Sequence, residues 1–141
     1  MKANGKQIKT NERINGLIYP DLSYKLMGIL FKVHRKLGNS YQEKYYQRAI
    51  ESELKSQKID YNRELLIRLN YDGTDIGKYF LDFVIDRKIA LEIKAVPVLK
   101  DQYFNQVLAY LDSAKLKLGI IANFRPERLF YKRLVNPRVK T

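Results

Sequence analysis

Cysteine is absent from the sequence, and histidine occurs only once, as His34. The lack of cysteine excludes disulfide bonds and thiolate metal sites, and it fits a cytoplasmic protein. A single histidine leaves almost no means of building a zinc site or a Ser-His triad, and we assign His34 no role. Any bound metal is therefore expected to be a hard cation held by oxygen atoms, such as Mg²⁺ or Mn²⁺.

Long apolar runs and acidic residues are also scarce. No run approaches the ~18 residues of a transmembrane helix, and the N-terminus has no signal-peptide core, so we expect no membrane span. Asp and Glu number 15 against 27 Lys and Arg, which gives a net charge of +12. From Lys115 to Thr141 there are eight basic residues and one Glu. A lysine-rich surface is common among soluble proteins, but this excess favours a nucleic-acid partner.

The sequence contains enough apolar residues for one substantial core. Hydrophobic residues make up 45% of the 141 positions, including 11 Tyr and 6 Phe, which is typical of a globular chain. We expect a flexible basic arm over residues 1–18, a single domain over 19–136 and a frayed C-terminus over 137–141. No internal repeat or low-complexity segment interrupts this domain.

Hydrophobic periodicity predicts helices and strands in a fixed order. A helix opens at Pro20 and ends at Gly38, and Ser40 is expected to cap a second helix with Glu43 completing a capping box. The remaining elements are expected at 59–70 (strand), 76–85 (strand), 89–96 (strand), 101–113 (helix), 116–123 (strand) and 128–135 (strand). This order predicts an α/β domain with a mixed central β-sheet flanked by helices.

The stretch Phe80–Val96 forms the centre of the prediction, as two strands joined by a turn at residues 86–88. Strand alternation places Glu92 and Lys94 on one face, and it places Asp82 on a face with Phe80 and Val84. A three-residue loop would set Asp82 opposite Glu92, with Cβ atoms about 5 Å apart, whereas a two-residue turn would pair Asp82 with Leu91. Two carboxylates this close repel unless a cation or a proton lies between them.

Each of these residues also has an ordinary structural interpretation. Glu92 and Lys94 could form a solvated ion pair worth less than about 1 kcal/mol. Asp82 could accept hydrogen bonds from backbone N–H groups or an arginine. The residues alone favour Glu43 as a helix cap over a carboxylate that points toward the pair, and Tyr110 taken alone is a core aromatic.

Together, the residues resemble the PD-(D/E)xK nuclease-like superfamily, and more closely the small bacterial GxxExxY family assigned to it. The superfamily pattern is an acidic residue on one strand, here Asp82, and a (D/E)-x-K on the next, here Glu92-Ile93-Lys94. Serine replaces the first glycine of GxxExxY, and leucine precedes Asp82 where many members have proline. The other matching positions are Ser40, Glu43 and Tyr46 for GxxExxY, and Gln106 and Tyr110 for a Q-x-x-x-Y on the following helix.

The resemblance covers about residues 21–135 and implies a restriction-endonuclease-like fold and a Mg²⁺- or Mn²⁺-dependent nuclease that cuts DNA or RNA. It implies that Asp82, Glu92 and the carbonyl of Ile93 ligate the metal, with Glu43 binding directly, through water or at a second metal. Lys94 would orient the nucleophile. Gln106 and Tyr110 would position Lys94 or the substrate. Members that bind without cutting leave a non-catalytic nucleic-acid-binding or assembly module as the alternative, and a homodimer paired through tyrosine-rich surfaces fits both.

Overall fold

The computed structural model describes residues 18–140, so the predicted arm over 1–18 lies outside the described residues except for Ile18. The elements in chain order are α2 (Pro20–Leu37), α3 (Glu43–Ser56), β1 (Tyr61–Tyr71), β2 (Thr74–Ile85), β3 (Ile89–Lys94), α4 (Asp101–Ala114), β4 (Leu118–Asn123) and β5 (Phe130–Val135). The strands form one sheet in the order β1-β2-β3-β4-β5, in which β3 and β4 are parallel and the other neighbours antiparallel. The predicted α/β fold with a mixed sheet is confirmed.

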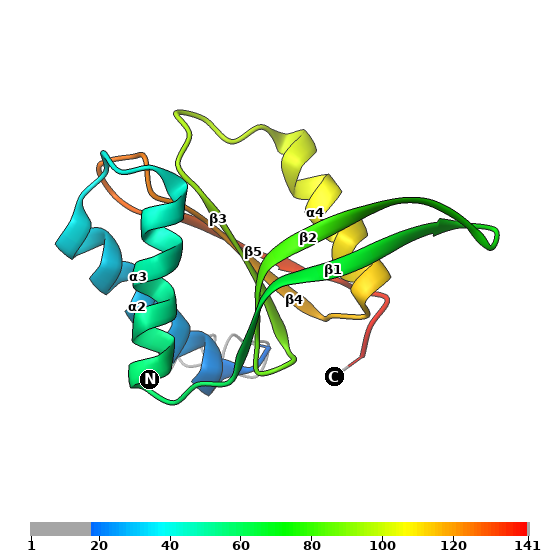
Figure 1. Ribbon diagram of the computed structural model, residues 1–141, viewed down its shortest axis with the longest axis horizontal. Helices are drawn as coiled ribbons and strands as arrows, with labels where there is room; N and C mark the ends of the chain where they lie inside the picture. Colours follow the sequence, from blue (N-terminus) through cyan, green and yellow to red (C-terminus); the bar gives the residue numbers. More distant parts are fainter. Residues whose placement is uncertain (1–17, 141) are drawn as a thin grey trace, which may run out of the picture.

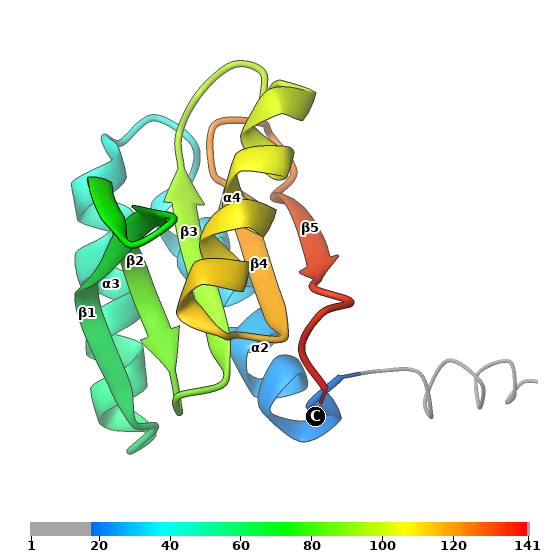
Figure 2. The same ribbon diagram turned by 90° about the vertical axis from the view of Figure 1, so that its right-hand side faces the viewer.

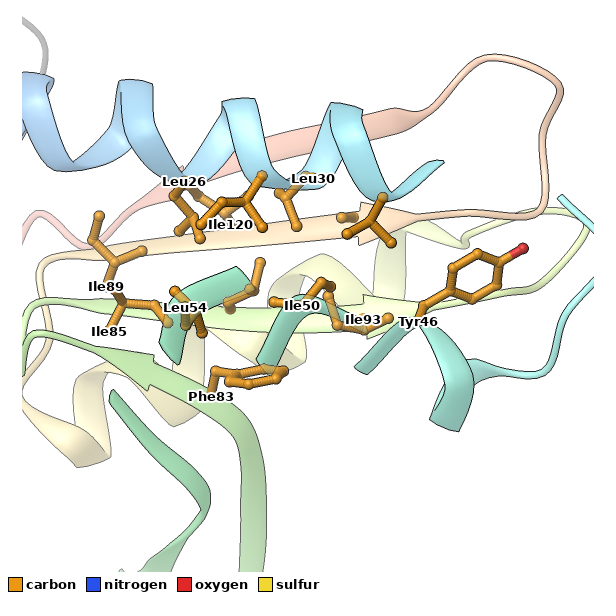
Figure 3. Packing of buried hydrophobic residues seen from close by; sticks show 14 of the residues in the cluster. Leu26, Leu30, Tyr46, Ile50, Leu54, Phe83, Ile85, Ile89, Ile93 and Ile120 are labelled. Carbon is orange, nitrogen blue, oxygen red and sulfur yellow. The ribbon is translucent and has the colours of Figure 1, made fainter. Parts of the chain in front are cut away.

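The sheet lies between two helical layers, with α4 on one face and α2 and α3 on the other (Figure 2). The larger hydrophobic cluster fills the space under α2 and α3, where Leu30 and Ile50 meet Ile93 and Ile120 of the sheet (Figure 3). A second cluster under α4 includes Val107 and Leu111. Because both faces are covered, β4 is buried along its whole length, as is typical of a central parallel strand.

The two N-terminal helices begin and end for different reasons. Pro20 lies in the first turn of α2, and Gly38 ends the helix with φ 78°, a backbone conformation that suits glycine. The predicted cap of the next helix is wrong, because the N-cap of α3 is Gln42 and its side chain makes no capping hydrogen bond. Ser40 instead donates to Asn39 Oδ1 at 3.4 Å. Glu43 is therefore the first residue of α3, and no capping box restrains its side chain.

The central hairpin has the register that a three-residue loop requires. Phe83 pairs with Leu91, Val84 with Ala90, and Ile85 with Ile89. The loop between them consists of residues 86–88, and both Asp86 (φ 50°) and Arg87 (φ 57°) adopt left-handed conformations. The predicted loop length is confirmed, and Asp82 and Glu92 are the next opposing positions beyond the last ladder pair.

The β1–β2 hairpin turns over partway along its length. Tyr61 and Phe83 pack with the cluster under α2 and α3, whereas Leu65 and Leu81 pack with the cluster under α4. Strict alternation would place all four residues on one face. The change occurs at Glu64, whose φ of 52° is left-handed and which leaves a gap in the β1–β2 pairing opposite Asp82 without shifting the register.

The change of faces within the hairpin shows that one prediction about β2 is wrong. Val84 is buried under α4 together with Leu81, while Phe80 is half exposed, so Phe80, Asp82 and Val84 do not form a single row on one face. Beyond Glu64 and Asp82, the β1–β2 hairpin extends past α4 (Figure 1). The Asp82 side chain therefore lies where β2 changes faces and where its ladder with β3 ends.

Candidate functional site

The carboxylates of Asp82 and Glu92 take the place of ladder hydrogen bonds between β2 and β3. The backbone N–H of Asp82 donates to Glu92 Oε2 at 2.8 Å, and the backbone N–H of Ile93 donates to Asp82 Oδ2, also at 2.8 Å. Each carboxylate thus binds the main chain of the opposing strand. The structure brings the two predicted acidic residues together and fixes them to the backbone at the point where the strands separate.

Glu92 is held from the α4 side by two phenols. Its carboxylate is only 2% exposed, and Oε1 accepts hydrogen bonds from the hydroxyls of Tyr79 at 2.7 Å and Tyr103 at 3.2 Å. The ring of Tyr79 stacks on Tyr110 with centroids 3.8 Å apart and planes 15° from parallel. Oε1 therefore has no free lone pair, whereas Oε2 accepts one hydrogen bond and keeps one.

Both carboxyl groups hold protons more tightly than ordinary side chains. Burial, with a smaller contribution from the charge of Glu43, raises the pKa of Asp82 to about 6, against the lowering effects of the hydrogen bond from the N–H of Ile93 and of the charges of Lys94 and Arg63. Burial, with a smaller contribution from the charge of Asp82, raises the pKa of Glu92 to about 7. The pair carries more negative charge than its surroundings compensate, which is the condition that a bound cation relieves.

Lys94 lies on the same strand and face as Glu92, as alternation predicts. It is half-buried, and its Nζ lies 4.6 Å from the centroid of the Tyr103 ring. In the part of the chain that the structure describes, no carboxylate lies within ion-pair distance of Lys94. Its charge lowers the pKa of Asp82 but is not consumed by a salt bridge, so the ammonium can act on a bound anion.

The other predicted site residues, Glu43, Gln106 and Tyr110, are related to Asp82, Glu92 and Lys94 in different ways. Glu43 is half-buried and close enough for its charge to raise the pKa of Asp82, yet residues 18–140 contain no group of three His, Asp or Glu side chains placed to hold a metal. Gln106 is exposed and lines a cavity together with Lys94. Tyr110 reaches Glu92 only through its stacking on Tyr79.

The comparisons with known proteins agree with this arrangement. A family model described as the PD-(D/E)XK nuclease superfamily matches residues 20–134. The chain belongs to the PD-(D/E)XK nuclease superfamily. One similar solved structure is the crystal structure of SSO0001, with 21% identity, a TM-score of 0.51, and coverage of 67% of this chain and 50% of that chain, a likeness of fold alone. No curated protein matches. No helix within residues 18–140 is long and apolar enough to cross a membrane.

Two tyrosines of this PD-(D/E)XK site are absent from the residues predicted to act there. Tyr103 could have been found, because it shares the face of its helix with Gln106 and Tyr110 and faces the strand that carries Glu92. Tyr79 could not, because alternation from Asp82 places it on the other face. Its contact with Glu92 exists only because β1 and β2 turn over at Glu64 and Asp82.

A polar clamp fixes the loop that leaves the PD-(D/E)XK strand β3. The buried side chain of Asn123 accepts from the N–H of Val96 at 3.0 Å and donates to its carbonyl at 2.8 Å. Arg125 donates to the carbonyls of Ala95 at 3.3 Å and Tyr41 at 3.0 Å. These hydrogen bonds connect the segment after Lys94 to the loop before α3. They therefore hold the end of β3 and the start of α3 in fixed positions relative to each other.

Proposed function

We propose that this chain is a metal-dependent nuclease that hydrolyses phosphodiester bonds of DNA or RNA, with the Asp82–Glu92 pair as its cation site. The observation that carries the proposal is a buried pair of carboxylates with raised pKa values, followed two residues later by a lysine that forms no ion pair with any residue in 18–140. The superfamily supports a nuclease-like function, a nucleic-acid substrate and the general use of divalent metals.

The donor atoms fit a hard divalent cation. Asp82 Oδ1 accepts no hydrogen bond from a residue in the range 18–140, and Glu92 Oε2 accepts only one. These two oxygens would hold Mg²⁺ or Mn²⁺, together with the carbonyl of Ile93 and water molecules. Glu43, which is no part of a three-residue group, would act through water or at a second metal.

Hydrolysis attaches a water oxygen to phosphorus and breaks the bond to the leaving oxygen. A divalent cation at the pair would polarise the phosphoryl oxygens and lower the pKa of the attacking water. The hydroxyls of Tyr79 and Tyr103 hold Glu92 in one orientation. The ammonium of Lys94 would offset the charge that builds on the phosphoryl oxygens and orient the water. Gln106 would contact the substrate backbone, and Tyr110 would support Tyr79.

Within the superfamily, we place the chain near the small bacterial GxxExxY family. The tyrosine of that pattern, Tyr46, donates to the carbonyl of Gly38 at 2.6 Å, accepts from the N–H of Tyr41 at 3.2 Å, and stacks on Phe124 with centroids 4.5 Å apart. These contacts fix the start of α3 and with it Glu43. In this proposal, the pattern sets the position of Glu43, whose charge acts on Asp82.

A non-catalytic nucleic-acid-binding module with the same fold is the alternative. The observation in its favour is that only two of the three predicted carboxylates come together in the described part of the chain. Such a module would bind nucleic acid in a strongly salt-dependent way and would need no metal.

Cleavage of end-labelled single- and double-stranded DNA and RNA tests the proposal, with Mg²⁺, Mn²⁺ or EDTA present in parallel reactions. We expect cutting of at least one substrate with either metal and none with EDTA. Glu127→Gln is a matched control, because this exposed glutamate lies outside the site and should leave cleavage unchanged. Binding of every substrate without cutting under any metal condition would favour the non-catalytic module.

A further inference from the structure

An open cavity of about 690 Å³ lies next to Lys94 and Tyr103, the residues that connect it to the carboxylate pair. It lies between the loop that follows β3 and the first turns of α4, and both Lys94 and Tyr103 belong to its wall. The hydroxyl of Tyr103 binds Glu92, and the Lys94 ammonium lies 4.6 Å from the centre of the Tyr103 ring. A phosphate held between Lys94 and the pair would therefore have one neighbouring nucleoside at the mouth of this cavity.

The loop side of the cavity is apolar and fixed in place. Val96, Val98 and Leu99 line it, and the backbone of Val96 is held on both sides by the amide of Asn123. Val98 is 73% exposed, so its side chain contributes little to the core. An apolar wall that faces solvent and is anchored at Val96 is suited to the flat face of a nucleobase.

The helix side supplies polar groups of matching chemistry. Three amides of α4 line the cavity, and none of them makes a hydrogen bond within residues 18–140; these are Gln102, Asn105 and Gln106. Amides offer both a donor and an acceptor to a base edge. Lys100 adds a second positive charge to the wall that Lys94 lines, and no Asp or Glu among residues 18–140 belongs to this wall. The composition fits an anionic ligand with a heteroaromatic group, which describes a nucleotide.

We infer that this cavity binds the nucleoside next to the phosphate to be cut, with its base unpaired. The inference rests on the proposed function, and it extends that function to a substrate class. A base that remains stacked and paired inside a duplex cannot present its flat face to the apolar wall, so the bound base must be single-stranded or displaced from the helix. The volume lies within the roughly 300–1,000 Å³ of ordinary ligand sites. The substrate is thus a strand with an unpaired nucleotide at the cleavage point.

Binding of labelled oligonucleotides to Asp82→Asn in EDTA tests the inference without cleavage. Four probes of equal length are compared at one salt concentration, so that phosphate contacts are matched. They are a single strand, a perfect duplex, a duplex with one unpaired nucleotide, and that duplex with the unpaired base removed. We expect the unpaired nucleotide to tighten binding at least about fivefold over the perfect duplex, and removal of its base to cancel the gain.

Substitutions of residues that line the cavity test whether the preference for an unpaired nucleotide arises there. Val98→Glu and the double variant with Gln102→Ala and Asn105→Ala should lose the preference for the unpaired base, while Gln57→Ala, an exposed amide on α3's C-terminal side, should keep it. Equal binding of perfect and interrupted duplexes, or a preference that survives both wall variants, would overturn the inference. If the preference holds but wild-type protein cuts nothing with metal, the proposed function fails and the cavity assignment stands. If no probe binds, the cavity assignment fails, and cleavage by the wild-type protein with metal decides the proposed function separately.

Discussion

Replacing Asp82 by asparagine is expected to stabilise the metal-free protein by about 2 to 3 kcal/mol near pH 8, and by roughly half as much near pH 5. In the folded protein, burial and neighbouring carboxylates raise the pKa of Asp82 to about 6 and that of Glu92 to about 7. Asparagine keeps an oxygen that can accept from the N–H of Ile93. The substitution therefore removes a buried charge without removing the hydrogen bond.

The sign of the pH dependence follows from proton binding. The unfolded chain titrates these groups near 3.8 and 4.5, whereas the folded chain titrates them near 6 and 7. Between about pH 4 and pH 7 the folded state binds more protons, so the pair's contribution to stability falls as pH rises through this window. Glu51 and Asp112 have lowered pKa values, because each accepts side-chain hydrogen bonds, and they contribute in the opposite direction.

The difference in unfolding free energy between wild type and Asp82→Asn reports on the Asp82–Glu92 pair alone, because Glu51 and Asp112 contribute equally to both proteins. Urea unfolding across the pH range should show the variant's advantage growing from acid to alkaline pH, and added Mg²⁺ should reduce it by stabilising the wild type. Glu127→Gln should show no such trend. A stability difference that is constant with pH, or a variant less stable than wild type at high pH, would show that the pair is not electrostatically strained.

Replacing Lys94 by methionine is expected to reduce the rate of metal-dependent cleavage by about 100- to 1,000-fold. Methionine keeps an unbranched apolar stem against the Tyr103 ring and removes the ammonium that lies on the same face of β3 as Glu92. Since Lys94 forms no ion pair with a carboxylate in residues 18–140, its loss should change the unfolding free energy by less than about 1 kcal/mol.

Single-turnover cleavage at saturating protein measures the chemical step apart from binding. Lys25→Ala removes an exposed lysine of α2 and serves as the control for the loss of one positive charge. Its rate should stay near that of wild type, with at most a small loss of affinity. A Lys94→Met protein that folds and cuts as fast as the Lys25 variant would remove Lys94 from the chemistry.

The order of the elements and the central register could be predicted because both depend on local patterns. Apolar periodicity gave the α/β arrangement, and the three-residue loop set Asp82 opposite Glu92. The alternation of β3 correctly placed Glu92 and Lys94 on one face, opposite the aliphatic row, because that short strand is regular and buried on both faces. Sequence periodicity is enough to predict the structure where a segment keeps one regular helical or strand pattern along its whole length.

Tertiary contacts decided the features that the sequence did not reveal. Glu64 is left-handed without being glycine or asparagine, so nothing in its type marks the place where the hairpin turns over. That turn brings Tyr79 to Glu92. Likewise, Ser40 fails to cap α3 because the preceding turn is held by the hydroxyl of Tyr46, which is a contact across the fold. The cavity beside Lys94 depends on the clamp from Asn123 and could not be seen in any one segment.

Titration of Mn²⁺ into the metal-free protein tests the cation site itself, with free Mn²⁺ followed by electron paramagnetic resonance near pH 8. We predict that the wild type binds Mn²⁺, that Mg²⁺ competes for the same site, and that Asp82→Asn weakens binding at least about tenfold, because it removes one of the two carboxylate ligands. Glu127→Gln should bind as the wild type does. Absence of Mn²⁺ binding by the wild type at millimolar concentrations, or undiminished binding by Asp82→Asn, would contradict the assignment of the Asp82–Glu92 pair as a cation site.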